Sequence, residues 1–165
     1  MPSHIETLDV PYAPEDMFQL VAGIADYPKF IKWIKALRVS QPQQVGSRHM
    51  CIGEAVVGFK GFTERFSTSV EADSAECTVK VRLVRGPFRR LVNNWAFRAN
   101  DAGGTAIRFE IDYEFSNMVL RALASSNQDR AVDKIMESFL IEADRRFRTP
   151  PGPGPTTGSP VAGSS

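Results

Sequence analysis

From about residue 36 to residue 115, apolar and polar side chains alternate with a period of two. The alternation is regular over residues 107–115, where every second side chain is aliphatic or aromatic and those between are charged. This period is typical of β-strands that have one buried and one solvated face. Gly86-Pro87 and Asp101-Ala102-Gly103-Gly104 are turn signals that interrupt it. The pattern predicts six consecutive strands, joined mostly by short turns, in an antiparallel sheet with one apolar face.

The segments on either side of this region predict the elements that flank and cover the sheet. Residues 3–10 alternate and predict a further strand. Pro14 begins a first helix, and Tyr27-Pro28 begins a shorter second helix. The apolar face expected for the second helix has helical spacing and consists of Phe30, Trp33, Ile34 and Leu37. Apolar side chains also recur at helical spacing between residues 119 and 147, which predicts a long C-terminal helix that the polar run 125–127 could interrupt.

A sheet with a large aromatic face needs a covering element, and the long helix can supply it. We therefore predict an α+β fold: a curved antiparallel sheet of about seven strands wrapped round a long C-terminal helix. The order is strand, two helices, six strands, helix. The folded domain is expected to take up residues 1–148. Residues 149–165 hold 5 of the 11 prolines, 4 of the 12 glycines and no charged side chain, so we expect a disordered tail there.

Charge and targeting signals narrow the classes of function. The chain carries 20 Lys and Arg against 19 Asp and Glu, a formal net charge of +1. This balance argues against a globally basic DNA-binding protein. No apolar run is long enough to span a bilayer, and the first residues have neither a secretion signal nor a transit-peptide pattern. We expect a cytoplasmic protein, and peripheral contact with the inner face of the membrane stays open.

Cysteine and histidine, which often serve as catalytic residues or metal ligands, are few in this chain. Cys51 and Cys77 are far apart in the sequence, and His4 and His49 lack the spacing of a metal site. No nucleophile-elbow, phosphate-loop or dinucleotide-binding motif occurs. We therefore expect no metal, no covalently bound cofactor and no catalytic residue.

Several short motifs follow one another between residue 5 and about residue 147. They are Val10-Pro11-Tyr12, Met17-Phe18-Gln19-Leu20-Val21, Asp26-Tyr27-Pro28-Lys29-Phe30-Ile31-Lys32-Trp33, Val57-Gly58-Phe59-Lys60-Gly61, Arg85-Gly86-Pro87-Phe88, Trp95-Ala96-Phe97 and Ile111-Asp112-Tyr113-Glu114-Phe115. In this order they resemble the coenzyme-Q-binding and ribosome-association-toxin family of START-like domains, which are polyketide cyclase-like (SRPBCC) proteins.

The resemblance implies a helix-grip (START-like) fold and a choice of functions. Some members of the family are hydrophobic carriers. Similarity to them implies that ubiquinone binds in an internal tunnel between the sheet and the C-terminal helix. It also implies a non-enzymatic lipid carrier or chaperone that supports cellular respiration. Another member of the family is a bacterial toxin that binds the large ribosomal subunit and blocks subunit association. A polyketide cyclase or aromatase is a further alternative. It needs a polar group inside the cavity, for which Glu54 and Glu64 are the candidates.

Aromatic and apolar residues on the inward side of their elements could line such a tunnel. They are Phe30, Trp33, Phe66, Phe88, Trp95, Phe97, Phe109, Tyr113, Met136 and Phe139. The polar ends of Tyr113 and Trp95 need partners when buried, and they could meet a quinone carbonyl. The same spacing also fits an ordinary filled core, and that alternative stays open.

Two sets of basic residues could contact a membrane or RNA. They are Lys29, Lys32 and Lys35 in the first set, and Arg85, Arg89 and Arg90 in the second. The lysines step by three along the second predicted helix, as in helices that lie on anionic bilayers. The arginines flank a turn and could meet phosphates of lipid headgroups or of ribosomal RNA. We expect Arg98, in contrast, to lie near the acidic side of strand 107–115. Merely solvated surfaces remain the alternative for both sets.

Overall fold

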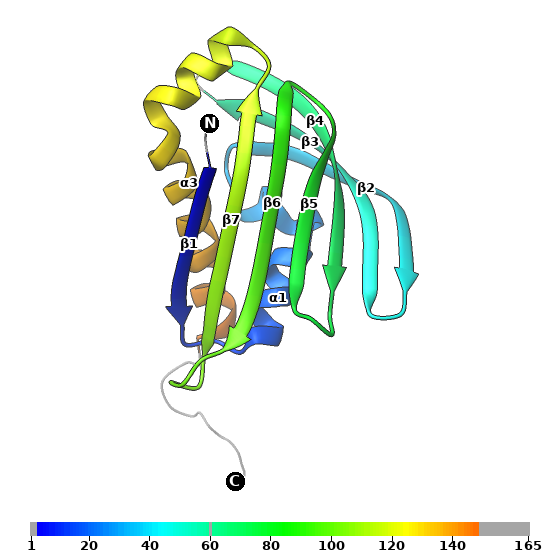
Figure 1. Ribbon diagram of the computed structural model, residues 1–165, viewed down its shortest axis with the longest axis vertical. Coiled ribbons are helices and arrows are strands. Elements are labelled where there is room, and N and C mark those ends of the chain that lie inside the picture. Colours follow the sequence, from blue (N-terminus) through cyan, green and yellow to red (C-terminus); the bar gives the residue numbers. More distant parts are fainter. Residues whose placement is uncertain (1–2, 60, 149–165) are drawn as a thin grey trace, which may run out of the picture.

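The computed structural model describes residues 3–59 and 61–148. One antiparallel sheet of seven strands carries most of them, and a long helix follows it (Figure 1). In chain order the elements are β1 (Ser3–Val10), α1 (Pro14–Ala22), the 3₁₀ turn η1 (Ile24–Asp26), α2 (Tyr27–Phe30), β2 (Ile34–Val45), β3 (Arg48–Phe59), β4 (Phe62–Asp73), β5 (Thr78–Arg85), β6 (Phe88–Ala99), β7 (Thr105–Phe115) and α3 (Met118–Phe147). The expected tail, residues 149–165, lies outside the described residues.

The strands lie in the order β1-β7-β6-β5-β4-β3-β2, so β1 and β2 form the two edges. Every neighbouring pair is antiparallel. The sheet curves, and α1 and α3 lie on the same side of it (Figure 1). This is the helix-grip architecture, and the order of elements confirms the prediction from the sequence.

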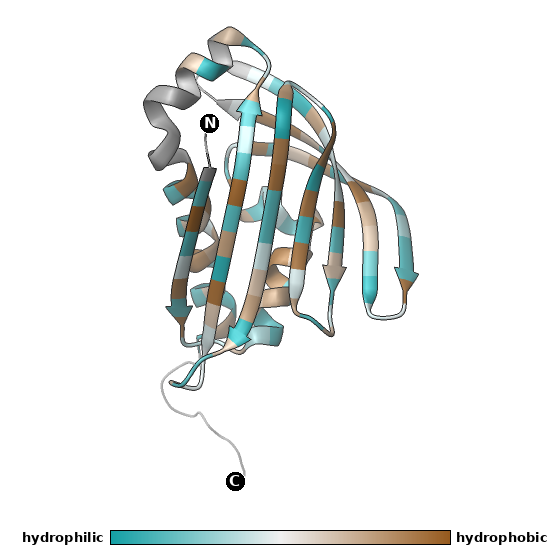
Figure 2. Ribbon diagram, in the orientation of Figure 1, coloured by the Kyte–Doolittle hydropathy of each residue, from teal (hydrophilic) through white to brown (hydrophobic). Residues whose placement is uncertain are grey.

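Alternating side chains divide the sheet into an inner face, which meets α1 and α3, and an outer face. Hydrophilic and hydrophobic residues alternate along the strands (Figure 2). On the inner face Val79, Phe97 and Ile107 are at most 1% exposed. The helices contribute further buried side chains to this core, namely Met17, Leu20, Val21, Val132, Met136 and Phe139. The core therefore sits beside α1, between the sheet and the second half of α3.

The second predicted helix is much shorter than expected. α2 ends at Phe30, and β2 already begins at Ile34, so the four residues of the predicted helical face do not share one helix. Ile34 lies opposite Val57 in β3, and the Gly58 N–H donates to the Trp33 carbonyl at 2.9 Å. Pairing with β3 gives this backbone hydrogen-bond partners, and it outweighs the helical spacing of the side chains.

The prediction that three lysines step along one helix was therefore wrong. Lys29 lies in α2, Lys32 in the turn that follows and Lys35 in β2. All three side chains are nevertheless exposed, so they remain available to a partner.

α3 runs without a break from Met118 to Phe147, including the polar run 125–127. Serine and asparagine each cost less than about 1 kcal/mol in a helix interior. The contacts of the rest of the helix can offset such a cost, so the potential interruption does not occur. Within the described residues, no helix combines the length and the apolar character needed to cross a membrane.

Candidate functional site

The residues predicted to line a tunnel all lie on or against the inner face, and the structure divides them between two clusters. The Trp95 ring lies 4.6 Å from that of Phe109 and 5.1 Å from that of Phe139, measured between centroids. Phe30 packs edge-on against Phe139 at 5.6 Å, and Trp33 packs against the same core. Five of the predicted residues are at most 4% exposed: Trp95, Phe97, Phe109, Met136 and Phe139. These contacts fill the first cluster as an ordinary protein interior.

The second cluster lies toward the end of the sheet where α3 begins. This upper aromatic cluster consists of Phe66, Phe88, Tyr113 and Phe115. The Phe88 ring lies edge-on to Phe66 at 5.3 Å and stacks on Phe115 at 4.7 Å. Tyr113 lies 5.7 Å from Phe115. Phe66, Phe88 and Phe115 are only half-buried, so this end of the inner face is less tightly covered than the core.

Between the two clusters the inner face is also incompletely covered. Val81, Asn93 and Ile111 lie side by side across β5, β6 and β7. All three are half-buried, and so is Leu83. We call these four residues and the upper aromatic cluster the upper inner surface. Because its side chains face the helices yet keep accessible area, the upper inner surface is the part of the interior that a hydrophobic ligand could cover.

Asn93 is the polar residue of this surface that the sequence interpretation missed. Its position, two residues from both Leu91 and Trp95, places it on their face, and the alternation alone could have shown this. Its Oδ1 accepts a hydrogen bond from the Trp95 indole N–H at 2.8 Å. Its Nδ2 donates to the Glu110 carbonyl at 2.8 Å. The Trp95 N–H thus has a protein partner, whereas the Asn93 amide carries a second N–H.

The two candidate carboxylates lie on opposite faces. Glu54 is on the outer face, where the Arg38 Nε donates to it at 2.9 Å. Glu64 lies opposite Val57, whose side chain packs against the core, so the half-buried Glu64 is on the inner face. Among the described residues, no group of three His, Cys, Asp or Glu side chains is close enough to hold a metal ion.

Arg90, and not Arg98, lies beside the acidic residues of β7, so the predictions for these two arginines were wrong. The Arg90 guanidinium lies 3.0 Å from the Asp112 carboxylate and 3.3 Å from that of Glu114. The Arg98 guanidinium instead donates to the Glu76 carbonyl at 2.6 Å. The register of β6 against β7 causes this, because it places Arg90, and not Arg98, opposite Glu114. Arg90 is therefore neutralised within the protein.

The other predicted basic residues remain at the surface. Arg85 and Arg89 are exposed, and neither forms an ion pair with a residue that the structure describes. Lys29 lies 3.1 Å from the partly exposed Asp26 carboxylate. Surface pairs of this kind contribute little, so the lysines stay available to an anionic partner.

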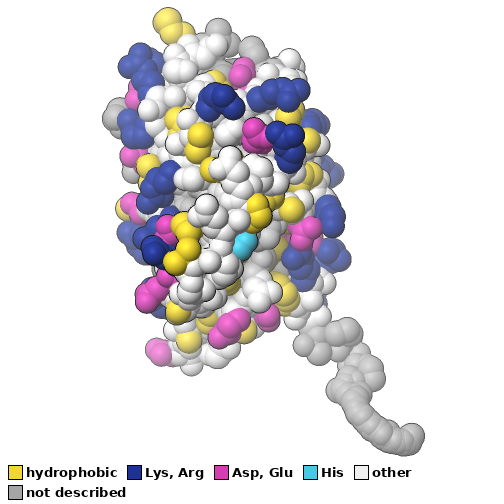
Figure 3. Space-filling model, turned by 90° about the vertical axis from the view of Figure 1, so that its right-hand side faces the viewer, with side chains coloured by type: hydrophobic (Ala, Val, Ile, Leu, Met, Phe, Trp, Pro, Cys, Tyr) yellow, Lys and Arg dark blue, Asp and Glu magenta, His cyan; other side chains and the backbone are white. Residues whose placement is uncertain are grey.

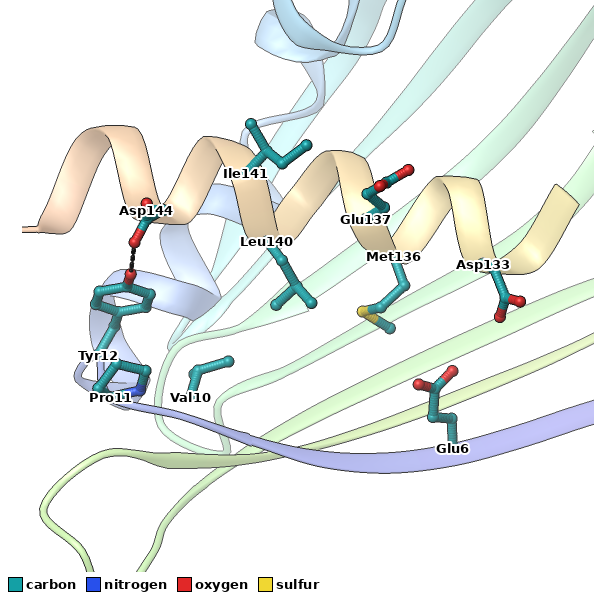
Figure 4. A pocket seen from close by; sticks show the side chains of 10 residues that line it. All are labelled: Glu6, Val10, Pro11, Tyr12, Asp133, Met136, Glu137, Leu140, Ile141 and Asp144. Carbon is teal, nitrogen blue, oxygen red and sulfur yellow. Dashed lines mark hydrogen bonds between the residues drawn. The ribbon is translucent and has the colours of Figure 1, made fainter. Parts of the chain in front are cut away.

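A separate groove of about 520 Å³ runs between β1 and the second half of α3 (Figure 4). Its floor is apolar and its rim is acidic: Glu6 and Asp133 point toward each other from the two elements. The Tyr12 hydroxyl donates to Asp144 at 2.5 Å, and this bond to a carboxylate is the main reason why the pKa of Tyr12 is raised. An uncharged isoprenoid ligand offers no partner for these carboxylates, so the upper inner surface is the better candidate site.

Comparisons with known proteins agree with this architecture. Residues 10–140 match the family described as polyketide cyclase / dehydrase and lipid transport. An 18 kDa protein of Caulobacter crescentus with a known solution structure is 34% identical, with a TM-score of 0.72, over 88% of this chain and 97% of that one. The ribosome association toxin RatA of Rickettsia prowazekii is 28% identical over 84% of this chain and 94% of its own length. The mitochondrial coenzyme Q-binding protein coq10 of Schizosaccharomyces pombe is 24% identical over 81% of this chain and 82% of its own. The chain belongs to the polyketide cyclase / dehydrase and lipid transport family.

Proposed function

We propose that the protein binds an isoprenoid quinone such as ubiquinone between the upper inner surface and α3. It would act as a non-enzymatic carrier or chaperone of this lipid in support of respiratory electron transport. The observation that carries the proposal is that the upper inner surface, with the exception of the buried Tyr113, is half-buried, and that it is apolar apart from the Asn93 amide and the Tyr113 hydroxyl. The similarity to a coenzyme Q-binding protein supports the choice of ligand.

The chemistry of a quinone matches this surface. Burial of the isoprenoid chain contributes roughly 25 cal/mol per Å² of apolar area before the costs of ordering. The rings of Phe66, Phe88 and Phe115 can stack with a quinone ring. Quinone carbonyls only accept hydrogen bonds, and the second N–H of Asn93 can donate one. None of these contacts needs an acid or a base, which is why we propose a carrier.

The first test is to purify the full chain from a quinone-producing bacterium and to extract it with organic solvent. Mass spectrometry should find quinone in a stoichiometric amount. An empty extract, together with failure to take up added quinone, would contradict the carrier function.

Two neighbouring residues of β5 offer a matched pair of variants. Leu83 faces inward and is half-buried, whereas Val84 faces outward and is 54% exposed. Leu83→Glu is expected to abolish quinone retention, because a carboxylate replaces apolar surface at the site. Val84→Glu should retain the ligand. Circular dichroism checks that both variants fold, and equal retention by two folded variants would remove Leu83 from the site.

A substitution of Glu64 can distinguish a carrier from a cyclase. An acid–base reaction on the inner face would use this half-buried carboxylate, whereas a carrier has no need of its charge. We therefore expect Glu64→Gln to retain quinone like the unchanged protein. Loss of a measurable cyclisation activity in the same variant would instead support an enzyme.

Binding to the large ribosomal subunit, with a block of subunit association, is the second candidate function. The exposed Arg89, which has no ion pair within the described residues, and the similarity to RatA favour it. Co-sedimentation with large subunits should weaken as salt is added. It should also weaken in Arg89→Glu more than in Arg108→Glu, since Arg108 lies 3.5 Å from Glu110 on the same sheet. Unchanged binding by Arg89→Glu would exclude this residue from the contact.

A further inference from the structure

A groove of about 620 Å³ lies on the outer face of the sheet, across β2, β3, β4 and β5. Its polar and charged lining consists of Arg38, Glu54, Arg65, Ser67 and Arg85. Strand register explains this grouping, because Arg38 lies opposite Glu54, Glu54 opposite Ser67, and Ser67 opposite Arg85. The charged side chains of the groove lie on the face of the sheet opposite the upper inner surface, although Phe66 of that surface also lines the groove.

Two of the three arginines in the groove have no ion-pair partner among the described residues. Arg38 is hydrogen-bonded to Glu54. The side chains of Arg65 and Arg85 form no ion pair or hydrogen bond with any residue that the structure describes. Seen from the β2 side, Lys and Arg side chains occur from the top of the molecule to below its middle, with some acidic side chains among them (Figure 3). Unpaired guanidinium groups that share one groove favour an anionic ligand.

Ser67 adds an available hydroxyl group to the arginines of the groove. It is only 7% exposed, and its hydroxyl has no hydrogen-bond partner within the described part of the chain. The Ser67 oxygen remains accessible from the groove, so a group that enters the groove can form a hydrogen bond with it. A ligand oxygen that enters the groove would satisfy it.

The backbone holds the end of β5 close to β4 at this point. Gly86 has a φ of +153°, and a Cβ there would lie 2.3 Å from the Cβ of Phe66. The register also shifts between Ser67 and Thr68, which leaves Arg85 opposite Ser67. The positive φ of Gly86, a conformation that favours glycine, therefore helps to place the neighbouring Arg85 over the groove.

We propose that this groove binds a small phosphorylated metabolite that also carries hydroxyl groups, in the manner of a sugar phosphate. The phosphate would take hydrogen bonds from Arg65, Arg85 and the Ser67 hydroxyl. The Glu54 carboxylate, which Arg38 holds in place, would accept a hydrogen bond from a hydroxyl of the ligand. The volume is in the range of small-molecule sites.

The same features argue against a long polyanion at this place. The buried Ser67 can be reached only by a group that enters the groove. The inference does not depend on quinone binding, because it uses the opposite face of the sheet.

The test is a titration of the full chain with ribose 5-phosphate, followed by calorimetry and by NMR. Saturable binding at one site is expected, with no binding of ribose and weaker binding of inorganic phosphate. Arg65→Gln and Ser67→Ala should each weaken binding by about tenfold or more. Arg108→Gln, which removes an exposed arginine elsewhere on the outer face, should leave binding unchanged.

Three outcomes would overturn the proposal. The first is the absence of saturable binding of both ribose 5-phosphate and inorganic phosphate. The second is an equal effect of Arg108→Gln and Arg65→Gln, which would indicate general charge attraction. The third is binding of an RNA oligonucleotide, or of vesicles with anionic lipid, that needs Arg65 and that ribose 5-phosphate does not displace.

Discussion

Gly86 supports structure on both faces of the sheet. Its φ of +153° lies where side chains are disfavoured, and an added Cβ would come 2.3 Å from the Cβ of Phe66. On the inner face this close approach accompanies the packing of Phe66 against Phe88. On the outer face it places Arg85 beside Ser67. One glycine therefore couples the upper aromatic cluster to the basic groove.

Replacement of this glycine should be costly. We expect Gly86→Ala to lower the free energy of unfolding by about 2–4 kcal/mol, through backbone strain and overpacking against Phe66. Gly46→Ala is the matched control, because Gly46 also has a positive φ, of +61°, but has nothing within 4 Å of an added Cβ. The control should cost about 1 kcal/mol. Urea unfolding followed by tryptophan fluorescence measures both, and equal losses would contradict the role of the Phe66 contact.

At the scale of elements, the second half of α3 is the anchored part of the helix. Glu142 is 5% exposed and accepts hydrogen bonds from Arg145 at 2.6 Å and from Arg146 at 2.7 Å. The Arg146 guanidinium also lies 5.7 Å from the Phe30 ring centroid and 3.8 Å from Asp26. These contacts join α3 to η1 and α2. The helix is thus held at one end while its beginning lies near the upper inner surface.

This anchor predicts a dependence of stability on pH. The hydrogen bonds from Arg145 and Arg146 lower the pKa of Glu142 from 4.5 to about 2. A lowered pKa in the folded state means that the ionised carboxylate stabilises the protein above pH 4.5 and that this contribution is lost as the pH falls from 4.5 toward 2. Thermal unfolding across this window should show a smaller loss in Glu142→Gln than in the unchanged protein. Asp133→Asn, at an exposed position of the same helix, should follow the unchanged protein. The same slope in all three proteins would refute the anchor.

At the scale of the whole molecule, the two faces of the sheet differ in their chemistry. The inner face combines a packed core with a partly covered apolar surface. The outer face carries a basic groove. A ligand between the sheet and α3 would connect the anchored core to the upper inner surface, so it should stabilise the entire domain and not one element alone.

Quinone binding should therefore raise the melting temperature. A ligand at about 100 times its Kd stabilises the folded state by about 2.7 kcal/mol. For a domain of this size we expect a rise in Tm of about 5–10 °C. Differential scanning calorimetry with a soluble short-chain quinone measures it, and the rise should be absent in Leu83→Glu. A similar rise in that variant would place the ligand elsewhere.

The proposed carrier function also requires contact with a bilayer. Lys29, Lys32 and Lys35 come from three successive segments and are all exposed. Each lysine near an anionic surface contributes about 1 kcal/mol. Reversal of all three to Glu should reduce binding to anionic vesicles in a flotation assay by at least about tenfold. Lys80→Glu, an exposed reversal on the outer face, should have a smaller effect, and equal losses would indicate non-specific attraction.

Much of the fold could be predicted from the sequence because its signals are local. Side-chain alternation identified the strands, and the turn at Asp101-Ala102-Gly103-Gly104 separated the last two. The helical spacing of Phe30, Trp33, Ile34 and Leu37 was misleading. Pairing between Ile34 and Val57 gives the backbone an extended conformation there. The alternation also predicts that Asn93 faces inward. Only the structure shows that its side chain accepts a hydrogen bond from the Trp95 indole N–H.

The sequence by itself determined which segments are strands, which side chains share a face, and the order of elements that makes this a helix-grip domain. These properties follow from the backbone period and from turn residues, which act over a few positions. Only the tertiary structure decided that Arg90 meets Asp112, that Trp95 belongs to the packed core, and that Phe88 belongs to a surface that is only half-buried. Those outcomes depend on register and curvature, which bring together residues far apart in the chain.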